Sequence, residues 1–114
     1  YVPYSGFRVG ACLKGVSGAY YLGCNIENAA YSPSNCAERT AVFKAVSEGE
    51  REFEALAIVS TGEQPAMPCG VCRQVLVEFC DPEMPIICSN RGGKYNIKTL
   101  GELLPFAFTK EDLT

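Results

Sequence analysis

A pair of cysteines opens a predicted helix in the stretch Pro68-Cys69-Gly70-Val71-Cys72. At positions i and i+3 of a helix the two sulfur atoms lie on one face, close enough to bind a single metal ion. The free N–H groups at a helix N-terminus favour the thiolate, which is the form that binds a metal. The pair alone also fits a thioredoxin-like redox motif or two core cysteines, so it leaves three interpretations open.

A third cysteine, Cys36, begins another predicted helix. Three protein ligands leave one coordination position of zinc open for water, which is the catalytic rather than the structural arrangement. A structural site needs a fourth ligand, and the chain has no histidine to supply it. The remaining cysteines are interpreted as small buried side chains; they are Cys12, Cys24, Cys80 and Cys88.

Glu38 and Arg39 follow Cys36 closely, and each has an ordinary explanation. A glutamate in the first turn of a helix interacts favourably with the helix dipole, and an arginine on a helix is commonly exposed. Positions i and i+2 of a helix do not share a face, so periodicity does not bring Glu38 beside the sulfur of Cys36. These two residues become informative only together with the cysteines.

The elements that must position these residues follow from the hydrophobic pattern. Residues 7–14 alternate between apolar and polar side chains, and with residues 19–24 they predict a β-hairpin. Helices are predicted over residues 36–47 and 69–79. The residues predicted to share the apolar face of the second helix are Val71, Val75 and Phe79.

Three further strands are predicted over residues 53–60, 85–89 and 95–99, with a short helical turn over residues 101–104. The strand over residues 53–60 is apolar almost throughout, which is typical of a strand covered on both faces. The order hairpin, helix, strand, helix, strand, strand predicts an α/β fold with a mixed sheet and helices packed on it.

Length and charge restrict the function classes. The chain is long enough for one domain, over residues 1–114, and no apolar run is long enough to span a bilayer. A net charge of −3 without a run of Lys and Arg argues against a nucleic-acid partner and favours a small substrate. Seven cysteines cannot all pair within one chain, and no secretory signal is present, so reduced thiols in the cytoplasm are expected.

In combination, Cys36-Ala37-Glu38 and Pro68-Cys69-Gly70-Val71-Cys72 resemble the signature of the zinc-dependent nucleoside and nucleobase deaminases. Other stretches resemble the small, homotetrameric cytidine deaminases, so that the resemblance runs from Val2 to Leu113. These stretches are Pro3-Tyr4-Ser5 with Phe7, Asn25-Ile26-Glu27-Asn28, Cys36-Ala37-Glu38-Arg39-Thr40 and Glu102-Leu103-Leu104-Pro105.

The resemblance implies a three-layer α/β/α fold around a mixed sheet of about five strands. Such enzymes usually carry a further helix before the Pro3-Tyr4-Ser5 segment, and this sequence shows no counterpart of it. One face of the sheet is therefore expected to lose its cover, while no metal ligand is lost.

The resemblance also implies an activity, the hydrolytic deamination of cytidine and deoxycytidine to uridine and deoxyuridine with release of ammonia, as a step of pyrimidine salvage. It implies that Cys36, Cys69 and Cys72 hold one Zn²⁺ per chain, which lowers the pKa of a bound water to about 7. Glu38 is then the proton carrier, which takes a proton from the water, passes it to ring N3 and helps to protonate the leaving amine.

The same resemblance assigns groups around the base. It implies that Arg39 donates hydrogen bonds to the ligand sulfurs, which offsets the negative charge of three thiolates on Zn²⁺. It implies that Phe7 stacks on the pyrimidine and that the backbone N–H of Ala37 donates to the base carbonyl. Phe7 could equally be a core residue, as far as its own position shows.

Further groups are assigned to the sugar and to a neighbouring subunit. The resemblance implies that Asn25 and Glu27 bind the sugar hydroxyls and that Tyr31 forms part of the sugar pocket. It implies that Phe108 completes the site of another subunit in a homotetramer. Without the resemblance, Asn25 and Glu27 are ordinary turn residues after a strand.

Three alternatives remain open at this point. A deaminase of a modified cytosine nucleoside, such as the blasticidin S type, would share the zinc motif, although residues 25–28 favour a plain ribose. A nucleic-acid editing deaminase is disfavoured by the acidic balance. A structural zinc module that only binds partners would have a saturated four-ligand site and no turnover.

Overall fold

The computed structural model describes residues 1–113, so Thr114, the last residue of the expected domain, lies outside the described residues. Its strands are β1 (Val9–Gly15), β2 (Tyr20–Cys24), β3 (Phe53–Ser60), β4 (Pro85–Asn90) and β5 (Tyr95–Thr99). The helices are α1 (Ala37–Ser47), α2 (Gly70–Phe79), α3 (Leu100–Leu103) and the 3₁₀ turn η1 (Lys110–Leu113). None of the helices in residues 1–113 has the length and apolar character that a membrane crossing requires.

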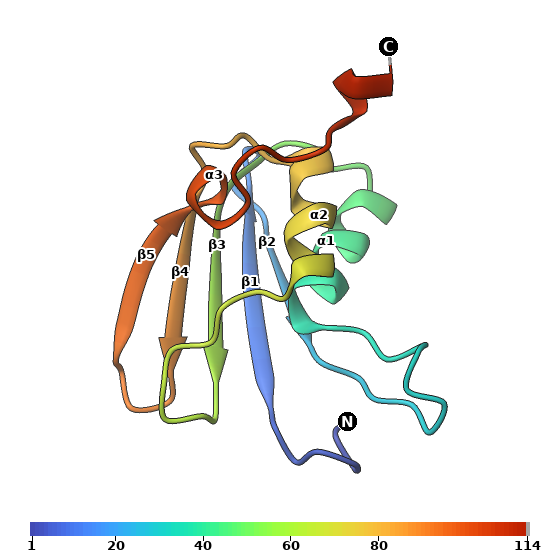
Figure 1. The fold of residues 1–114 in the computed structure, drawn as a ribbon, viewed down its shortest axis with the longest axis vertical. Coiled ribbons are helices and arrows are strands. Elements are labelled where there is room, and N and C mark those ends of the chain that lie inside the picture. Colours follow the sequence, from blue (N-terminus) through green and yellow to red (C-terminus); the bar gives the residue numbers. More distant parts are fainter. Residues whose placement is uncertain (114) are drawn as a thin grey trace.

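The strands form one sheet in the order β2-β1-β3-β4-β5 (Figure 1). β3 and β4 are parallel, and α2 forms the crossover between them, whereas all other neighbouring strands are antiparallel. Because β1 runs opposite to β3, the start of β1 lies beside the end of β3, with Val9 paired to Ser60. The predicted α/β class and the mixed five-stranded sheet are confirmed.

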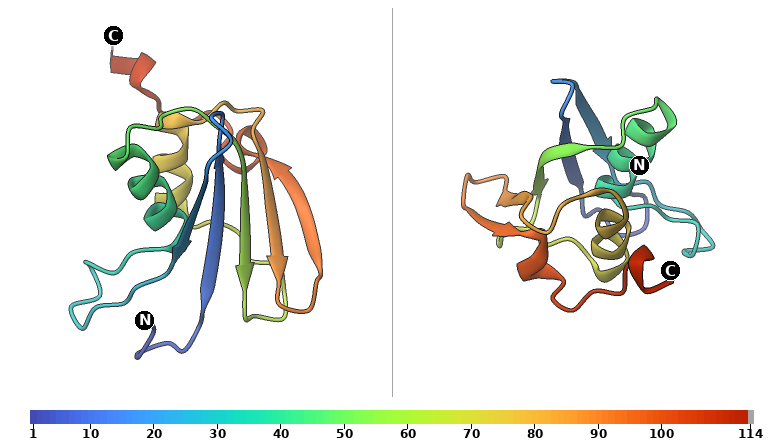
Figure 2. Two further views of the ribbon diagram at one scale, coloured as in Figure 1. Left: turned by 180° about the vertical axis from the view of Figure 1, so that it is seen from behind. Right: turned by 90° about the horizontal axis from the view of Figure 1, so that it is seen from above.

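The two long helices, α1 and α2, lie on the same face of the sheet (Figure 1 and Figure 2). Successive side chains of a strand point to opposite faces, so alternate residues of the central strands meet these helices. The largest buried apolar side chains between the layers include Leu13, Leu56, Ile58 and Ile86 from the sheet and Val42 and Leu76 from the helices.

The opposite face of the sheet has no packed layer among the described residues. Cys12, Ala57 and Ile87 form a cross-strand row there and are only partly buried, and Val59 is 43% exposed. The prediction that β3 is covered on both faces is therefore wrong within residues 1–113, because the residues on this face of β3 remain partly or largely exposed. Within residues 1–113 the long helices therefore cover one face of the sheet, and the third layer that the resemblance implies is not present among these residues.

The predicted apolar face of α2 is confirmed only in part, because Val75 and Phe79 pack against the core but Val71 does not. Val71 is 57% exposed, and Val75 and Phe79 are only partly buried, whereas Cys72 and Leu76 are completely buried. Cys72 and Leu76 are spaced i, i+4 and so lie on one face of the helix. Hydrophobicity alone favoured the valines, but the helix turns its cysteine toward α1 and the sheet.

Close packing between β2 and α1 fixes where α1 begins. A Cβ on Gly23 would lie 2.3 Å from the carbonyl oxygen of Ala37, so only glycine permits this approach. The loop between β2 and α1 is closed by a two-way backbone pairing of Ile26 and Asn35, at 3.0 and 2.9 Å. These contacts bring the residues that follow β2 next to the N-terminus of α1.

Candidate active site

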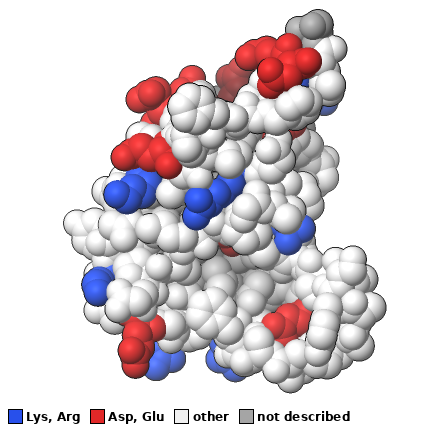
Figure 3. Space-filling view, in the orientation of Figure 1, with Lys and Arg blue, Asp and Glu red and all other residues white. Residues whose placement is uncertain are grey.

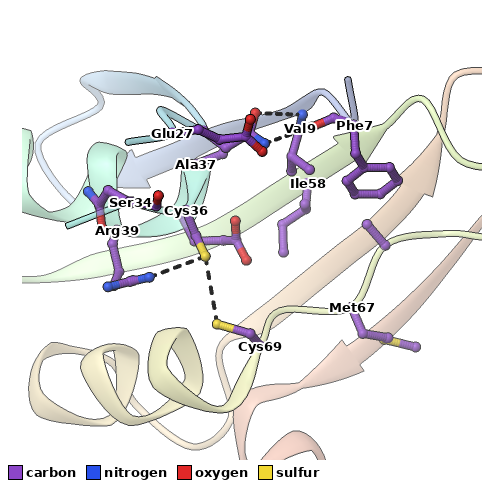
Figure 4. A pocket seen from close by; sticks show the side chains of 14 residues that line it. Phe7, Val9, Glu27, Ser34, Cys36, Ala37, Arg39, Ile58, Met67 and Cys69 are labelled. Atoms are coloured by element: carbon purple, nitrogen blue, oxygen red, sulfur yellow. Dashed lines mark hydrogen bonds between the residues drawn. The ribbon is translucent and has the colours of Figure 1, made fainter. Parts of the chain in front are cut away.

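The N-termini of α1 and α2 meet at a cluster of three thiols from Cys36, Cys69 and Cys72. Figure 4 shows two of them, Cys36 and Cys69. All three sulfur atoms lie within 4.8 Å of one another, and the Sγ atoms of Cys36 and Cys69 are 3.7 Å apart. No His, Asp or Glu belongs to this cluster, and no fourth cysteine does, among the described residues. Three soft donors without a fourth fit a zinc ion that keeps one coordination position open.

The helix ends create an electrostatic environment for these sulfurs. Cys36 is the N-cap of α1 and Cys69 is the N-cap of α2, where its Sγ accepts a hydrogen bond from the Cys72 N–H at 3.5 Å. Burial acts to raise the pKa of Cys69, but the N–H groups of α2 and the neighbouring thiols outweigh it, and the pKa is lowered. Cys69 is therefore predisposed to be the thiolate that a metal requires.

Arg39 supplies the positive charge beside the cluster. Its Nη2 donates a hydrogen bond to Cys36 Sγ at 3.3 Å (Figure 4). Burial acts to lower the pKa of Arg39, but its interactions with Cys36 and Cys72 prevail, and the pKa lies above its ordinary value. Its buried Nε has no hydrogen-bond partner among the described residues. The guanidinium thus faces the sulfurs with donors that suit a negatively charged three-thiolate centre.

Glu38 lies next to the cluster but is not one of its ligands. The side chain is 4% exposed, and this burial raises the pKa of Glu38, against smaller opposing effects of its own backbone N–H, Cys72 and Arg39. A carboxyl group that is held out of water near a metal centre has the environment of a general acid and base.

A cavity of about 340 Å³ opens beside Glu38 and the cluster, within the size range of small-molecule sites (Figure 4). Predicted site residues that line it are Phe7, Asn25, Glu27, Cys36, Ala37, Glu38, Arg39 and Cys69. The other lining residues are Val9, Ser34, Asn35, Ile58, Ala66 and Met67. Figure 3, in the orientation of Figure 1, shows a hollow in a part of the surface with few charged side chains.

Asn25 holds the segment that carries Phe7. Its Oδ1 accepts from the Val9 N–H at 3.0 Å, and its Nδ2 donates to the Phe7 carbonyl at 2.8 Å. A Cβ on Gly62 would lie 3.2 Å from the Phe7 ring, so glycine leaves room for that ring at the cavity wall. The oxygen and the nitrogen of the Asn25 amide thus each form one hydrogen bond within the protein.

Glu27 gathers the N-terminal segment around its carboxylate. Its Oε1 accepts from the backbone N–H groups of Tyr4 at 2.9 Å and Ser5 at 3.1 Å, and its Oε2 accepts from the Ser5 hydroxyl. The hydrogen bond from the Ser5 side chain is the main cause that lowers the pKa of Glu27. Glu27 is therefore a fixed negative charge at the cavity wall.

Two of the predicted substrate-binding residues, Tyr31 and Phe108, lie outside this cavity. Tyr31 is 72% exposed, has a φ of 61°, and lines an adjoining hollow with Tyr4, Ser5, Glu27 and Ser34. Its ring meets that of Tyr4 edge to face, with centroids 6.0 Å apart. Phe108 is 60% exposed and lies on the C-terminal segment, away from the site of its own chain.

Two residues that sequence reasoning missed secure the segments around the cluster. Arg73 Nε donates to the Pro68 carbonyl at 2.7 Å, and its Nη1 donates to the Leu103 carbonyl at 2.7 Å. Gln74 Nε2 donates to the Phe108 carbonyl at 2.9 Å. In the sequence, these two long polar side chains follow Cys72 directly, which could have marked them as residues near the site. The sequence does not indicate which distant carbonyl each side chain reaches.

Comparison with known proteins agrees with this site. Residues 1–88 match the family described as "Cytidine and deoxycytidylate deaminase zinc-binding region". A cytidine deaminase of Sporosarcina psychrophila is 58% identical over 114 residues, 100% of this chain and 84% of that protein. One of Halalkalibacterium halodurans is 50% identical over 113 residues, 99% of this chain and 86% of that protein.

Solved structures give the same result. The crystal structure of cytidine deaminase from Burkholderia pseudomallei matches with a TM-score of 0.91 at 45% identity, covering 95% of this chain and 87% of that chain. The crystal structure of cytidine deaminase from Mycobacterium tuberculosis matches with a TM-score of 0.81 at 42% identity, covering 95% of this chain and 84% of that chain. The matched zinc-binding region includes all three cysteines of the cluster. This chain therefore belongs to the cytidine and deoxycytidylate deaminase family.

Proposed function

We propose that this protein hydrolyses cytidine and deoxycytidine to uridine and deoxyuridine with release of ammonia, within pyrimidine salvage. The observation that carries the proposal is the buried Glu38 beside three converging thiols at a cavity of about 340 Å³. A carboxyl group that can exchange protons, next to a metal centre with an open position, suits the addition of water to a pyrimidine.

Cys36, Cys69 and Cys72 are the residues that hold the zinc ion, and zinc when bound supplies the acidification of water to a pKa of about 7. Glu38 accepts a proton from the attacking water and delivers it to ring N3. Glu38 then takes the proton of the new C4 hydroxyl and helps to deliver it to the exocyclic amine as the bond from that amine to C4 breaks, so that cytidine and water give uridine and ammonia. The burial of Glu38, which raises its pKa, supports this shuttle role.

The cavity wall supports a division of the binding roles. Phe7 is proposed to stack on the base, and the N–H of Ala37, in the first turn of α1 where helix donors lack internal partners, to donate to the base carbonyl. Asn25 and Glu27 are proposed to bind the sugar hydroxyls, and their position on the cavity wall supports this. Arg39 is proposed to stabilise the thiolate ligands, as its hydrogen bond to Cys36 suggests.

We further propose a homotetramer in which Phe108 of one subunit completes the site of another. The position of Phe108 supports this role, because the side chain is 60% exposed and outside the cavity of its own chain. Tyr31 is proposed to contribute to the sugar end of the site through the adjoining hollow. Sedimentation velocity tests the assembly, and a fully active monomer would contradict the shared site.

The proposal also assigns the protein to the cytoplasm, with residues 1–114 as one catalytic domain. All seven cysteines are free, which is typical of a reducing compartment. On the face shown in Figure 3, Lys and Arg do not gather into one patch, and Asp and Glu gather near the C-terminal end. This distribution supports a nucleoside substrate over a nucleic acid.

The direct test follows the loss of cytidine by ultraviolet absorbance, with the zinc content measured on the same sample. We expect turnover and one zinc per chain, complete loss of turnover after chelation, and recovery when zinc is added back. Zinc without turnover of cytidine or deoxycytidine would favour the structural module, and turnover of blasticidin S alone would favour the modified-nucleoside alternative. Magnesium added back in place of zinc is the control.

A further inference from the structure

Ser5 connects two groups that the proposed function assigns to the substrate. The Ser5 hydroxyl donates to Glu27 Oε2, and it accepts a hydrogen bond from the backbone N–H of Phe7 at 3.0 Å. One hydroxyl has one proton to donate and lone pairs to accept, so both bonds form at the same time. The proposed sugar-binding carboxylate and the proposed base-stacking residue are thus joined through a single oxygen.

We infer that Ser5 is a positioning residue for nucleoside binding, which acts through Glu27 and Phe7 without lining the main cavity itself. This inference rests on the proposed function. Glu27 lines both the main cavity and the adjoining hollow, whereas Ser5 lines only the hollow. The Ser5 hydroxyl therefore holds the carboxylate from the side of the adjoining hollow.

The local backbone makes this contact possible. Gly6 has a φ of 67°, a conformation that favours glycine, and its N–H donates to the Val2 carbonyl at 3.0 Å. The resulting turn brings the Phe7 N–H back to the Ser5 hydroxyl. Asn25 fixes the next part of the segment through Phe7 and Val9. Ser5 is the remaining link between the position of Phe7 and the carboxylate of Glu27.

The same arrangement occurs at the other end of β1, away from the cavity. In Ser17-Gly18-Ala19, Gly18 has a φ of 95°, and the Ala19 N–H donates to the Ser17 hydroxyl at 3.3 Å. The Ser17 hydroxyl donates to Glu50 Oε1, and the Ser17 N–H donates to Glu50 Oε2 at 3.3 Å. Neither Ser17 nor Glu50 lines the cavity.

The Ser17 site is therefore a matched internal control. Each serine is exposed and gives a carboxylate one hydroxyl and one backbone hydrogen bond, and in each case its hydroxyl is the main cause that lowers the pKa of that carboxylate. Loss of either hydroxyl removes a similar contribution to folding. Only loss of the Ser5 hydroxyl is expected to alter the binding of substrate.

The experiment compares Ser5→Ala, Ser5→Thr and Ser17→Ala in the zinc-loaded protein. It measures KM and kcat for cytidine, the Kd of the product uridine by calorimetry, and the melting temperature. We expect Ser5→Ala to raise KM and Kd roughly tenfold, the effect of losing one hydrogen bond to a charged group, with kcat within about twofold. Ser5→Thr keeps a hydroxyl at an exposed position and is expected to restore both constants.

Ser17→Ala is expected to lower the melting temperature by an amount similar to Ser5→Ala and to leave KM and Kd unchanged. Equal KM and Kd in Ser5→Ala and the wild type would overturn the role of Ser5, as would an equal rise in Ser17→Ala. A wild type that neither deaminates cytidine nor binds uridine would overturn the proposed function and this role together. Wild-type turnover with an unaltered Ser5→Ala overturns the role of Ser5 alone.

Discussion

Two carboxylates line the same cavity in opposite environments. Glu38 is 4% exposed beside the sulfur cluster, and its burial raises its pKa. Glu27 is partly exposed and accepts three hydrogen bonds from Tyr4 and Ser5, of which the one from the Ser5 side chain does most to lower its pKa. Both side chains have the same chemical group, so the difference lies entirely in what surrounds each carboxylate.

The opposite pKa shifts of Glu38 and Glu27 suit two different chemical roles. A carboxyl group with a raised pKa takes up a proton more readily than an ordinary carboxyl group, which suits a proton carrier. A carboxylate with a lowered pKa stays ionised and accepts hydrogen bonds from hydroxyl groups. The fold therefore gives the proposed proton carrier, Glu38, and the proposed sugar-binding residue, Glu27, different environments, and changing each carboxylate in turn tests whether their roles differ.

The largest effect is expected for Glu38→Gln. The amide keeps the volume of the side chain but cannot carry the proton, so kcat for cytidine is expected to fall about 100- to 10,000-fold. KM is expected to change little, and zinc analysis should still give one ion per chain, because Glu38 is not a ligand. Full activity in this variant would show that Glu38 is not the proton carrier, and the difference between the two carboxylates would then have no catalytic meaning.

A smaller effect of a different kind is expected for Glu27→Gln. Loss of the negative charge weakens the proposed contact with the sugar hydroxyls, so KM for cytidine is expected to rise on the order of 10- to 100-fold. Steady-state kinetics should show kcat much less affected than in Glu38→Gln, since the interaction is present in ground and transition state alike. Glu50→Gln, which changes the matched carboxylate outside the cavity, is the control and should keep the KM of the wild type.

The smallest effect concerns stability and pH. The pKa of Glu27 is lowered below its ordinary value of 4.5, so the folded state binds the proton less readily than the unfolded chain does. The stability that the ionised Glu27 contributes is therefore fully present above about pH 4.5 and is lost as pH falls through the lower pKa of the folded state. Circular dichroism melts of the zinc-free wild type and Glu27→Gln between about pH 3 and 7 measure it.

The melting temperatures of these two proteins are expected to differ by a constant amount above this window and to converge below it. Glu50→Gln should show the same window, because the pKa of Glu50 is lowered by Ser17 in the same way. A difference that persists unchanged at the acidic end would mean that the Gln variant is destabilised by packing rather than by loss of the charge.

Much of the site could be predicted from local spacing. Cys69 and Cys72 are three positions apart in a helix, which brings their side chains together within one element. The alternation in β1 and the largely apolar run of β3 predicted their strands correctly. The face of α2 was not predictable in this way, because the valines of the helix are more hydrophobic than the buried Cys72.

The residues and their spacing by themselves determined the order of the strands and helices, the pairing of Cys69 with Cys72 on one helix and the absence of a histidine ligand, whereas the three-cysteine ligand set came from the resemblance to a known family. Tertiary structure decided that Cys36 meets Cys69, 33 positions away, that Glu38 is buried beside them, and that Arg73 reaches Leu103. It also decided that Ser5 and Glu27 meet, 22 positions apart. Local periodicity fixes neighbours within one element, whereas contacts between elements depend on how α1 and α2 pack side by side on one sheet.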